Sequence, residues 1–326
     1  MRVSLKLAVS LSLIAIILWK IGGLGEVLAV LSRIHPLYVV LILLVNTLDR
    51  GLMTYKWARL LQGRGVTLPL LRGMRIYCAA MIWGMFLPAT MGADAIRAFS
   101  TSRTGVDANE VVASIVVERM VGFLSALLLG LLSLVLLSSM GSLDPRFDFV
   151  WWIGGATLLG ATVVFATSFS QGAFDLLHLR LLGRFRDTGV MTKLRRFHST
   201  YRAYQNDKKM LAMFFGLTFA EQILTIVHGW LNALGLGIQV SFLYVAGAVP
   251  LAILVARLPV SIDGLGVYDG VFMLIMSLAG MPPAEAVAIA LSGRILQTVS
   301  WTPWWLAHIA GTGSVRPPRP LPQSGC

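Results

Sequence analysis

FLPATMGADAIRAF, residues Phe86–Phe99, places a proline, a glycine, a carboxylate and an arginine inside an otherwise apolar stretch. About 170 residues later, RLPVSIDGLGVYDG, residues Arg257–Gly270, repeats the pattern with the same Leu-Pro opening. Proline removes a backbone N–H and clashes with the preceding helical turn, so a helix that reaches Pro88 or Pro259 must stop. The two stretches therefore predict two broken helices.

The composition decides which solvent surrounds these breaks. The chain has 326 residues, of which 56% are hydrophobic and only 13% are charged. That is too little polar surface to cover a soluble globule, so the chain needs lipid around it. Because a bilayer core leaves no water for unpaired backbone groups, the long apolar stretches should be helices. We expect an all-α polytopic protein of the cell inner (cytoplasmic) membrane, forming a single integral membrane domain over residues 1–326.

Apolar windows of about 20 residues mark the expected transmembrane spans. The first follows Arg2 and Lys6 and resembles a signal peptide, but no small-x-small cleavage site follows it, which favours an uncleaved span. We expect about six full spans, near residues 7–22, 37–55, 111–139, 149–170, 210–233 and 284–309.

The net charge of +12 is concentrated in short basic segments between apolar windows, which argues against nucleic acid as a partner. Cytoplasmic loops carry an excess of Lys and Arg, so both termini should be cytoplasmic. The longest basic segment, Arg180 to Lys209, mixes aromatic residues with its cations. It is either a plain cytoplasmic loop or, within an interfacial segment near 175–209, a helix that binds anionic headgroups.

Two segments, 73–103 and 241–280, remain between the spans, and they contain the two broken stretches. If each is a re-entrant helical hairpin, the first opens to the cytoplasm and the second to the outside, and every basic segment falls inside. The order span, hairpin, span then occurs twice with opposite orientation, near 37–139 and 210–309. This arrangement is an inverted-topology repeat, as found in several transporter folds.

Two hairpins that end inside the membrane would line a polar cavity. Glycines after each proline let the backbone turn and approach a ligand closely. Helices that restart near Met91 and Gly266 would present free N–H groups and a partial positive charge, which suit a phosphate.

The stretches FLPATMGADAIR, VVERMVG and LPVSIDGLGVYDG resemble, in order and spacing, the motifs of the lysylphosphatidylglycerol synthase transmembrane family, whose members are described as flippase-like. DRGLMTYKWARLL, from Asp49, is similar to the family's Arg-rich segment. The resemblance covers nearly the whole chain and implies a domain that translocates lipid. Ala93, Asp263 and Tyr268-Asp269 depart from the family pattern. The 326 residues contain no aminoacyl-transfer segment, so we do not expect lysine transfer from them.

Several charged residues have two readings. Arg294 lies deep in the last span and needs a partner, which is either a structural carboxylate or a substrate phosphate. Asp94 caps a helix or faces the cavity, and Asp49 and Arg50 near the end of their span are expected to snorkel to the interface. Glu221 is a candidate for proton coupling or a hydrogen-bonded helix contact.

The candidate lipid-binding residues are those at the two breaks and the charged residues of the following spans. They are Arg50, Pro88, Gly92, Asp94, Arg97, Glu118, Arg119, Pro259, Ser261, Asp263, Gly264, Gly266, Asp269 and Arg294. The five histidines are scattered, and no Cys-x-x-Cys or Walker loop occurs, so we expect no metal, cofactor or catalytic residue.

These observations predict a protein that binds and flips an amphiphilic membrane lipid, a phospholipid or polyprenyl-phosphate with a phosphate-containing headgroup, and that is not an enzyme. The alternative is an intramembrane enzyme or accessory subunit acting on such a headgroup.

Overall fold

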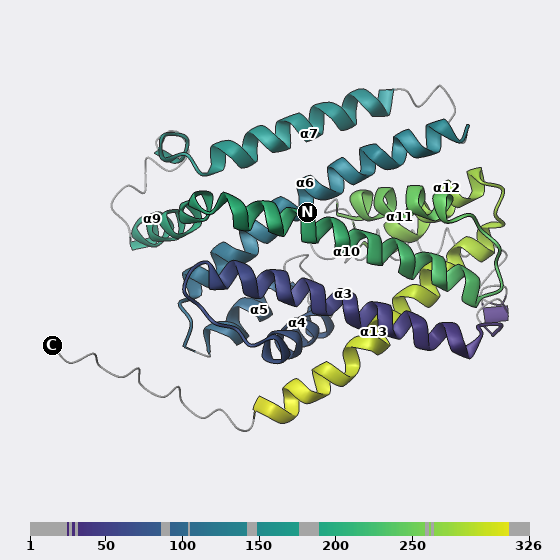
Figure 1. The fold of residues 1–326 in the computed structure, drawn as a ribbon, viewed down its shortest axis with the longest axis horizontal. Helices are drawn as coiled ribbons and strands as arrows, with labels where there is room; N and C mark the ends of the chain where they lie inside the picture. Colours follow the sequence, from purple (N-terminus) through teal and green to yellow (C-terminus); the bar gives the residue numbers. More distant parts are fainter. Residues whose placement is uncertain are drawn as a thin grey trace.

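The computed structural model describes residues 25, 28–29, 32–85, 92–103, 105–141, 149–175, 189–257, 261 and 264–312. Every regular element within these ranges is a helix and none is a strand (Figure 1), which confirms the predicted all-α class. The expected first span at 7–22 and the candidate residues Pro88, Pro259 and Asp263 lie outside the described residues.

Four helices are long and apolar enough to cross a membrane: α3 (Pro36–Gln62), α6 (Ala108–Ser139), α7 (Phe149–Ser168) and α10 (Lys208–Gly235). They contain the spans expected at 37–55, 111–139 and 210–233, and α7 covers the span expected at 149–170 except for its last two residues. The span expected at 284–309 is also a single helix, α13 (Pro283–Thr312), but it is not among those four. The chain is therefore a multi-pass membrane protein.

Side chains outside the apolar windows set where these helices begin. His35 accepts a hydrogen bond from Leu37 N ahead of α3, and Pro36 supplies the first helical residue. Asp107 caps α6 and Asp207 caps α10 in the same way. The pKa of Asp107 is lowered, chiefly because the backbone N–H of Asn109 donates to its carboxylate. Polar residues beside an apolar run thus decide the helix starts.

Each of the two segments between the spans forms a pair of short helices. The first pair is α4 (Leu70–Met85) with α5 (Gly92–Ser102), and the second is α11 (Phe242–Ala256) with α12 (Val267–Leu278). With a rise of 1.5 Å per residue, these helices are about 16 to 24 Å long. Each is therefore shorter than the roughly 30 Å of a hydrocarbon core.

The two helical pairs share a close contact between their limbs. A Cβ atom on Gly84 would lie 2.8 Å from the backbone N of Ala93. In the second pair, a Cβ on Gly264 would lie 2.9 Å from Cβ of Ala256. Ala256 follows Gly84 by about 171 residues in the sequence, and Gly264 follows Ala93 by about the same distance. The two Leu-Pro sequences have this separation as well. Glycine thus brings the limbs together at matching positions in both pairs.

The long helices surround these pairs in matched positions (Figure 1). Helix α3 runs antiparallel to α10, because His35 N donates to Gly235 O at one end, 2.8 Å away, while Gly63 faces Met210 at the other. Helix α4 packs on α13, and α11 packs on α6. Helices α5 and α12 each pack on the long helix that follows them in the chain. Each half of the chain therefore completes the packing of the other half.

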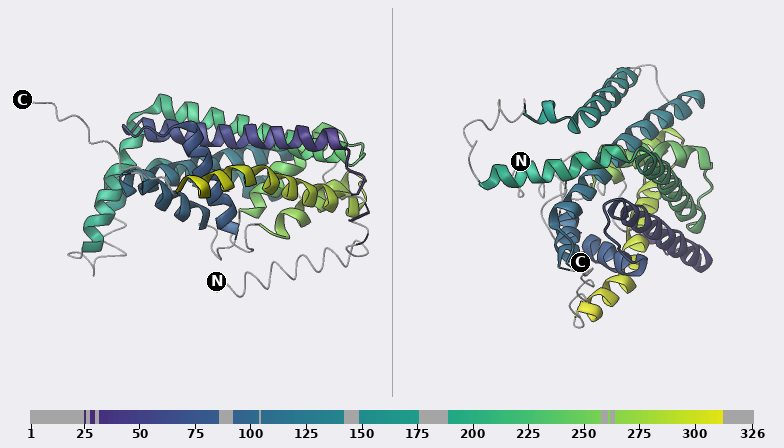
Figure 2. Two further views of the ribbon diagram at one scale, coloured as in Figure 1. Left: turned by 90° about the horizontal axis from the view of Figure 1, so that it is seen from below. Right: turned by 60° about the vertical axis from the view of Figure 1, so that its left-hand side comes forward.

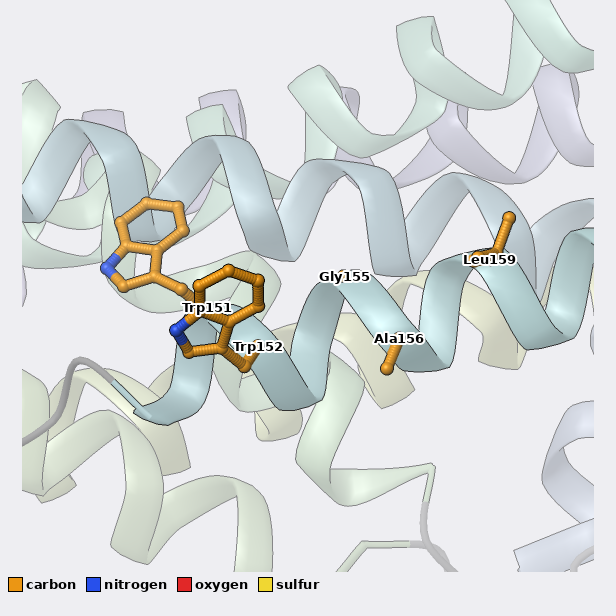
Figure 3. Close-up of a pocket in the computed structure, with 5 residues that line it drawn as sticks. All are labelled: Trp151, Trp152, Gly155, Ala156 and Leu159. Atoms are coloured by element: carbon orange, nitrogen blue, oxygen red, sulfur yellow. The ribbon is translucent and has the colours of Figure 1, made fainter.

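Helix α7 lies at the edge of the bundle, against α6 (Figure 2). None of the residues in its 18-residue apolar window is buried. A shallow hollow on this helix is lined by residues of α7 alone, as Figure 3 shows: Trp151, Trp152, Gly155, Ala156 and Leu159. One face of a single helix does not enclose a ligand, so we interpret this hollow as lipid-facing surface.

The basic segment after α7 is described from Gly189 onward. Helix α9 (Gly189–Arg202) is amphipathic: Tyr201 stacks on Phe169 with ring centroids 4.7 Å apart, while Arg195 and Arg196 are exposed. Arg196 also binds Asp107, with 2.8 Å between Nη2 and Oδ2. The helix is thus held against the bundle with cations on its outer face.

Candidate functional site

The most enclosed charge of the site is Arg97 of α5, whose side chain is 2% exposed. Its guanidinium lies between the rings of Trp57 and Tyr77, with centroids 4.6 and 4.8 Å away. It donates two hydrogen bonds to Glu118 of α6, at 3.2 and 2.8 Å, and Tyr77 donates a third to the same carboxylate at 3.0 Å. Two of the candidate lipid-binding residues therefore bind each other inside the protein.

Two further ion pairs occupy matching positions in the two halves of the chain. Asp94 is the third residue of α5, and Arg119 Nε donates to its Oδ2 at 2.7 Å. Asp269 is the third residue of α12, and Arg294 Nη2 lies 3.6 Å from its Oδ2. In both pairs the arginine follows the carboxylate by 25 residues. Each pair therefore joins the second helix of a helical pair to the long helix after it.

The two ion pairs differ in length and in hydrogen bonding. Nε of Arg294 and Oδ1 of Asp269 are buried and have no hydrogen-bond partner among the described residues. Oδ2 of Asp269 accepts instead from the backbone N–H of Gly266, at 3.0 Å, which caps α12. The Asp94–Arg119 pair is shorter, although the Arg119 side chain is 57% exposed. The Arg119 guanidinium is therefore accessible to a ligand, although it is bound to Asp94.

Arg257, at the end of α11, is a second exposed arginine in this region. A Cβ atom on Gly122 of α6 would lie 3.7 Å from Nη1 of Arg257. Gly122 is one helical turn beyond Arg119. The charges of Glu221 and Arg119 both act on Arg257. No ion pair to Arg257 occurs within the part of the chain that the structure describes. The site thus has an arginine that our sequence analysis did not select.

A signal for Arg257 was present in the sequence. The residue opens the second broken stretch directly before Leu-Pro, where the first stretch has Phe86. A cation at the point where a membrane helix must stop is costly unless it serves a ligand or has a partner. Comparing the two stretches position by position would have identified it.

Asp49 and Arg50 are not at the interface, so the expectation that they snorkel is wrong. They are 4% and 8% exposed, because α3 continues to Gln62 and places them midway along the helix. Arg50 Nε donates to Asp49 Oδ2 at 3.0 Å, and its guanidinium lies 5.6 Å from the ring of Trp301. Arg50 is therefore held inside the bundle.

Lys56 and Glu221 form an ion pair between α3 and α10. Lys56 Nζ also donates to Thr218 Oγ1, at 3.3 Å. Glu221 thus makes a hydrogen-bonded contact between two helices, one of the two readings that its sequence allowed.

The remaining candidate residues shape the turns beside these pairs. Gly92 opens α5, while Gly264 and Gly266 have φ of +70° and +76° in the turn that leads into α12. Positive φ favours glycine. Ser261 is 1% exposed, and its hydroxyl has no partner in the part of the chain that the structure describes. Within the described ranges, no group of three or more His, Cys, Asp or Glu is placed to hold a metal ion.

The sequence is similar to known membrane proteins over nearly its full length. A family model described as the lysylphosphatidylglycerol synthase TM region matches residues 3–303. A UPF0104 membrane protein of Methanothermobacter thermautotrophicus is 23% identical over 316 residues, which cover 90% of this chain and 89% of that protein. A UPF0104 membrane protein of Methanocaldococcus jannaschii is 22% identical over 314 residues, or 88% of each chain. The chain therefore belongs to the lysylphosphatidylglycerol synthase transmembrane-region family.

Proposed function

We propose that the chain binds the phosphate-containing headgroup of an amphiphilic lipid between its two helical pairs and carries it across the cell membrane. The family's description, which names a synthase of a modified phospholipid, supports a lipid as the ligand. The observation that carries the proposal is the placement of two exposed arginines, Arg119 and Arg257, beside the same stretch of α6.

The two arginines suit a phosphate for an electrostatic reason. Like charges repel more strongly where protein and lipid exclude water than they do in bulk solvent. An anion between them offsets that repulsion. The forked guanidinium groups can also donate paired hydrogen bonds to phosphate oxygens, which a lysine cannot reproduce. A phosphate-containing headgroup therefore complements this part of the protein.

Movement of the headgroup follows from the two matched ion pairs. A phosphate that binds Arg119 competes with Asp94, and so loosens the contact between α5 and α6. The looser Asp269–Arg294 pair has unused polar atoms with which to tighten. In our proposal one pair closes as the other opens, so that the headgroup gains access first to one side of the membrane and then to the other.

We further propose that residues near 37–139 and 210–309 are two inverted repeats of one domain. The antiparallel α3 and α10, the matched packing partners and the equal 25-residue spacing of the ion pairs support this reading. The short helical pairs are then re-entrant hairpins, the first open to the cytoplasm and the second to the outside. Both termini are cytoplasmic, and the cations of α9 face anionic headgroups.

Removing both exposed arginines should abolish lipid movement. The test uses vesicles of phosphatidylcholine with a trace of phosphatidylglycerol that carries a fluorophore on its headgroup, and an external reductant that bleaches only the outer leaflet. Each charge-assisted contact contributes about 1.5 to 3 kcal/mol. Arg119→Gln or Arg257→Gln should therefore slow the protein-dependent bleaching of the inner-leaflet lipid by about 10-fold or more, and the double variant should reach the protein-free rate.

Arg59→Gln is the matched control, because Arg59 is an exposed arginine of α3 whose described contacts are with Gln62 and the Tyr55 ring of the same helix. It should bleach at the wild-type rate. Equal rates in protein-free and wild-type vesicles, across phosphatidylglycerol and polyprenyl-phosphate probes, would reject translocation. A probe recovered with a chemically altered headgroup would instead favour an intramembrane enzyme.

Labelling of single cysteines tests the inverted repeat separately. In a background without Cys78 and Cys326, we expect cysteines at Arg103 and Pro282 to react with an impermeant maleimide from opposite sides of the membrane. Both positions are exposed, and they follow α5 and α12, which lie at opposite ends of the bundle in Figure 1. Reaction of both cysteines from the same side would contradict the inverted arrangement.

A further inference from the structure

A row of polar side chains follows the contact between α3 and α10 and reaches α13. Thr218 and Asn232 mark its ends on α10, and the 14 residues between them rise about 21 Å. This covers most of a hydrocarbon core of about 30 Å. The row comprises Lys56, Asp49 and Asn46 on α3, Thr218, Glu221, His228 and Asn232 on α10, and Ser292 on α13.

The two ends of this row are hydrogen-bonded. Lys56 binds Glu221 and Thr218 near the Gln62 end of α3. Near the other end, Ser292 Oγ donates to Asn232 Oδ1 at 3.1 Å. These contacts hold polar groups in line along the two helices.

The middle of the row is not hydrogen-bonded in the same way. Among the described residues, no partner lies in hydrogen-bond geometry with the buried atoms Asp49 Oδ1, Asn46 Nδ2 and His228 Nε2, although the His228 ring faces the backbone of Gly293. Asp49 and Asn46 are one helical turn apart on α3, and the charges of Asp49 and Arg50 both act on His228. A buried polar atom without a partner costs about 1 to 3 kcal/mol, so three at one place indicate a function.

On the two facing helices the fixed charges cancel, and Arg257 at the end of α11 adds a positive charge that interacts with Glu221. Asp49 and Glu221 are acids, and Arg50 and Lys56 are bases, all on the two facing helices. From the other elements, Tyr77 of α4 acts on Arg50. On α13, Gly293 faces the His228 ring. The next residue, Arg294, forms an ion pair with Asp269. One proton added to the four groups of α3 and α10 changes their net charge from zero to +1, which matches the single negative charge of a phosphodiester headgroup.

We propose that Asp49 and His228 form a proton-binding site, and that the row of polar side chains along α3 and α10 is the path by which protons reach it. The inference rests on the proposed lipid transport and adds its energy source, because one proton moves with one anionic headgroup. Both groups exchange protons readily through oxygen or ring nitrogen, and acid and histidine chains inside membranes form proton relays.

A pH gradient across vesicles tests this coupling. A difference of one pH unit corresponds to about 1.4 kcal/mol per proton, which is a factor of about 10 in an equilibrium. In vesicles that are one pH unit more alkaline inside, the wild-type protein should therefore raise the inner-to-outer ratio of labelled phosphatidylglycerol about 10-fold. Internal pyranine should report acidification in step. The orientation of the protein in the vesicle does not change this equilibrium.

The variants place the proton site. Asp49→Asn and His228→Gln should still equilibrate the lipid, but the ratio should stay near one. Asn46→Ala removes the third unpartnered group without changing a charge, and it should weaken the shift. Ser125→Ala is the matched control, because Ser125 is a buried residue of α6, outside the row, and its hydroxyl also lacks a partner among the described residues.

The outcomes separate the two proposals. If the wild type does not move lipid, the proposed function fails and the coupling fails with it. If the wild type equilibrates lipid but the ratio ignores the pH gradient, or follows a sodium gradient instead, transport stands and proton coupling is overturned. If the shift persists in folded Asp49→Asn and His228→Gln, the proton binds elsewhere.

Discussion

Replacing Glu118 by alanine is expected to destabilise the protein by about 3 to 5 kcal/mol, because the change strands a buried cation. Arg97 would remain enclosed by Trp57 and Tyr77 without an acceptor for its two strongest hydrogen bonds. The remaining acid nearby, Asp94, is 3.8 Å away and already bound to Arg119. Thermal unfolding in detergent should show the loss as a much lower midpoint than that of the wild type.

Two variants show whether a stranded charge is the cause. Arg97→Met combined with Glu118→Leu removes both charges, and should recover most of the stability that the single change loses. Glu110→Ala breaks the Arg64–Glu110 pair, which is nearer the surface, and should cost less than about 1 kcal/mol. If the double variant is as unstable as Glu118→Ala, then packing rather than charge explains the loss.

Substituting valine for Gly84 is expected to separate α4 from α5 and to stop lipid movement. A Cβ at this position would lie 2.8 Å from N and 2.9 Å from Cα of Ala93, so backbone rather than a flexible side chain must shift. Overpacking of this kind typically costs about 1 to 3 kcal/mol. The displaced α5 would also carry Asp94 away from Arg119. Unfolding midpoints and the reductant assay measure the two effects on the same sample.

The control for this change is Gly216→Ala on α10, where nothing lies within 4 Å of the new Cβ. It should be neutral or stabilise the protein by up to about 1 kcal/mol, because alanine favours a helix over glycine. A Gly84→Val protein with wild-type stability and transport would show that the first helical pair need not stay closed.

The sequence was sufficient to predict the helices whose apolar runs are long and uninterrupted. Hydropathy alone predicted the spans that became α3, α6, α7 and α10, because each such run has one low-energy solution in lipid. The hydropathy pattern placed the end of the second span at residue 55, which is too early, because Lys56 and Arg59 resemble interfacial residues. In the structure Lys56 is 2% exposed and bound to Glu221, a partner 165 residues away.

The partners of the buried charges were harder to predict than the charges themselves. Sequence reasoning selected Arg97, Glu118, Arg119 and Arg294 as charged candidates, but it did not identify which acid Arg294 would bind. The structure pairs Arg294 with Asp269. Which acid an arginine meets depends on how two helices are rotated against each other, and hydropathy does not record that rotation.

Each half of the chain packs against the other, and this has a consequence for how the protein is synthesised. Helix α4 packs on α13, which begins roughly 200 residues later in the chain. At 5 to 20 residues per second, a ribosome needs about 10 to 40 s to add that length. During this interval the first helical pair, with its ion pairs already formed, lacks the helix that covers it. The newly synthesised first half therefore depends on the insertion machinery, or on surrounding lipid, to cover its exposed surface until α13 has been inserted.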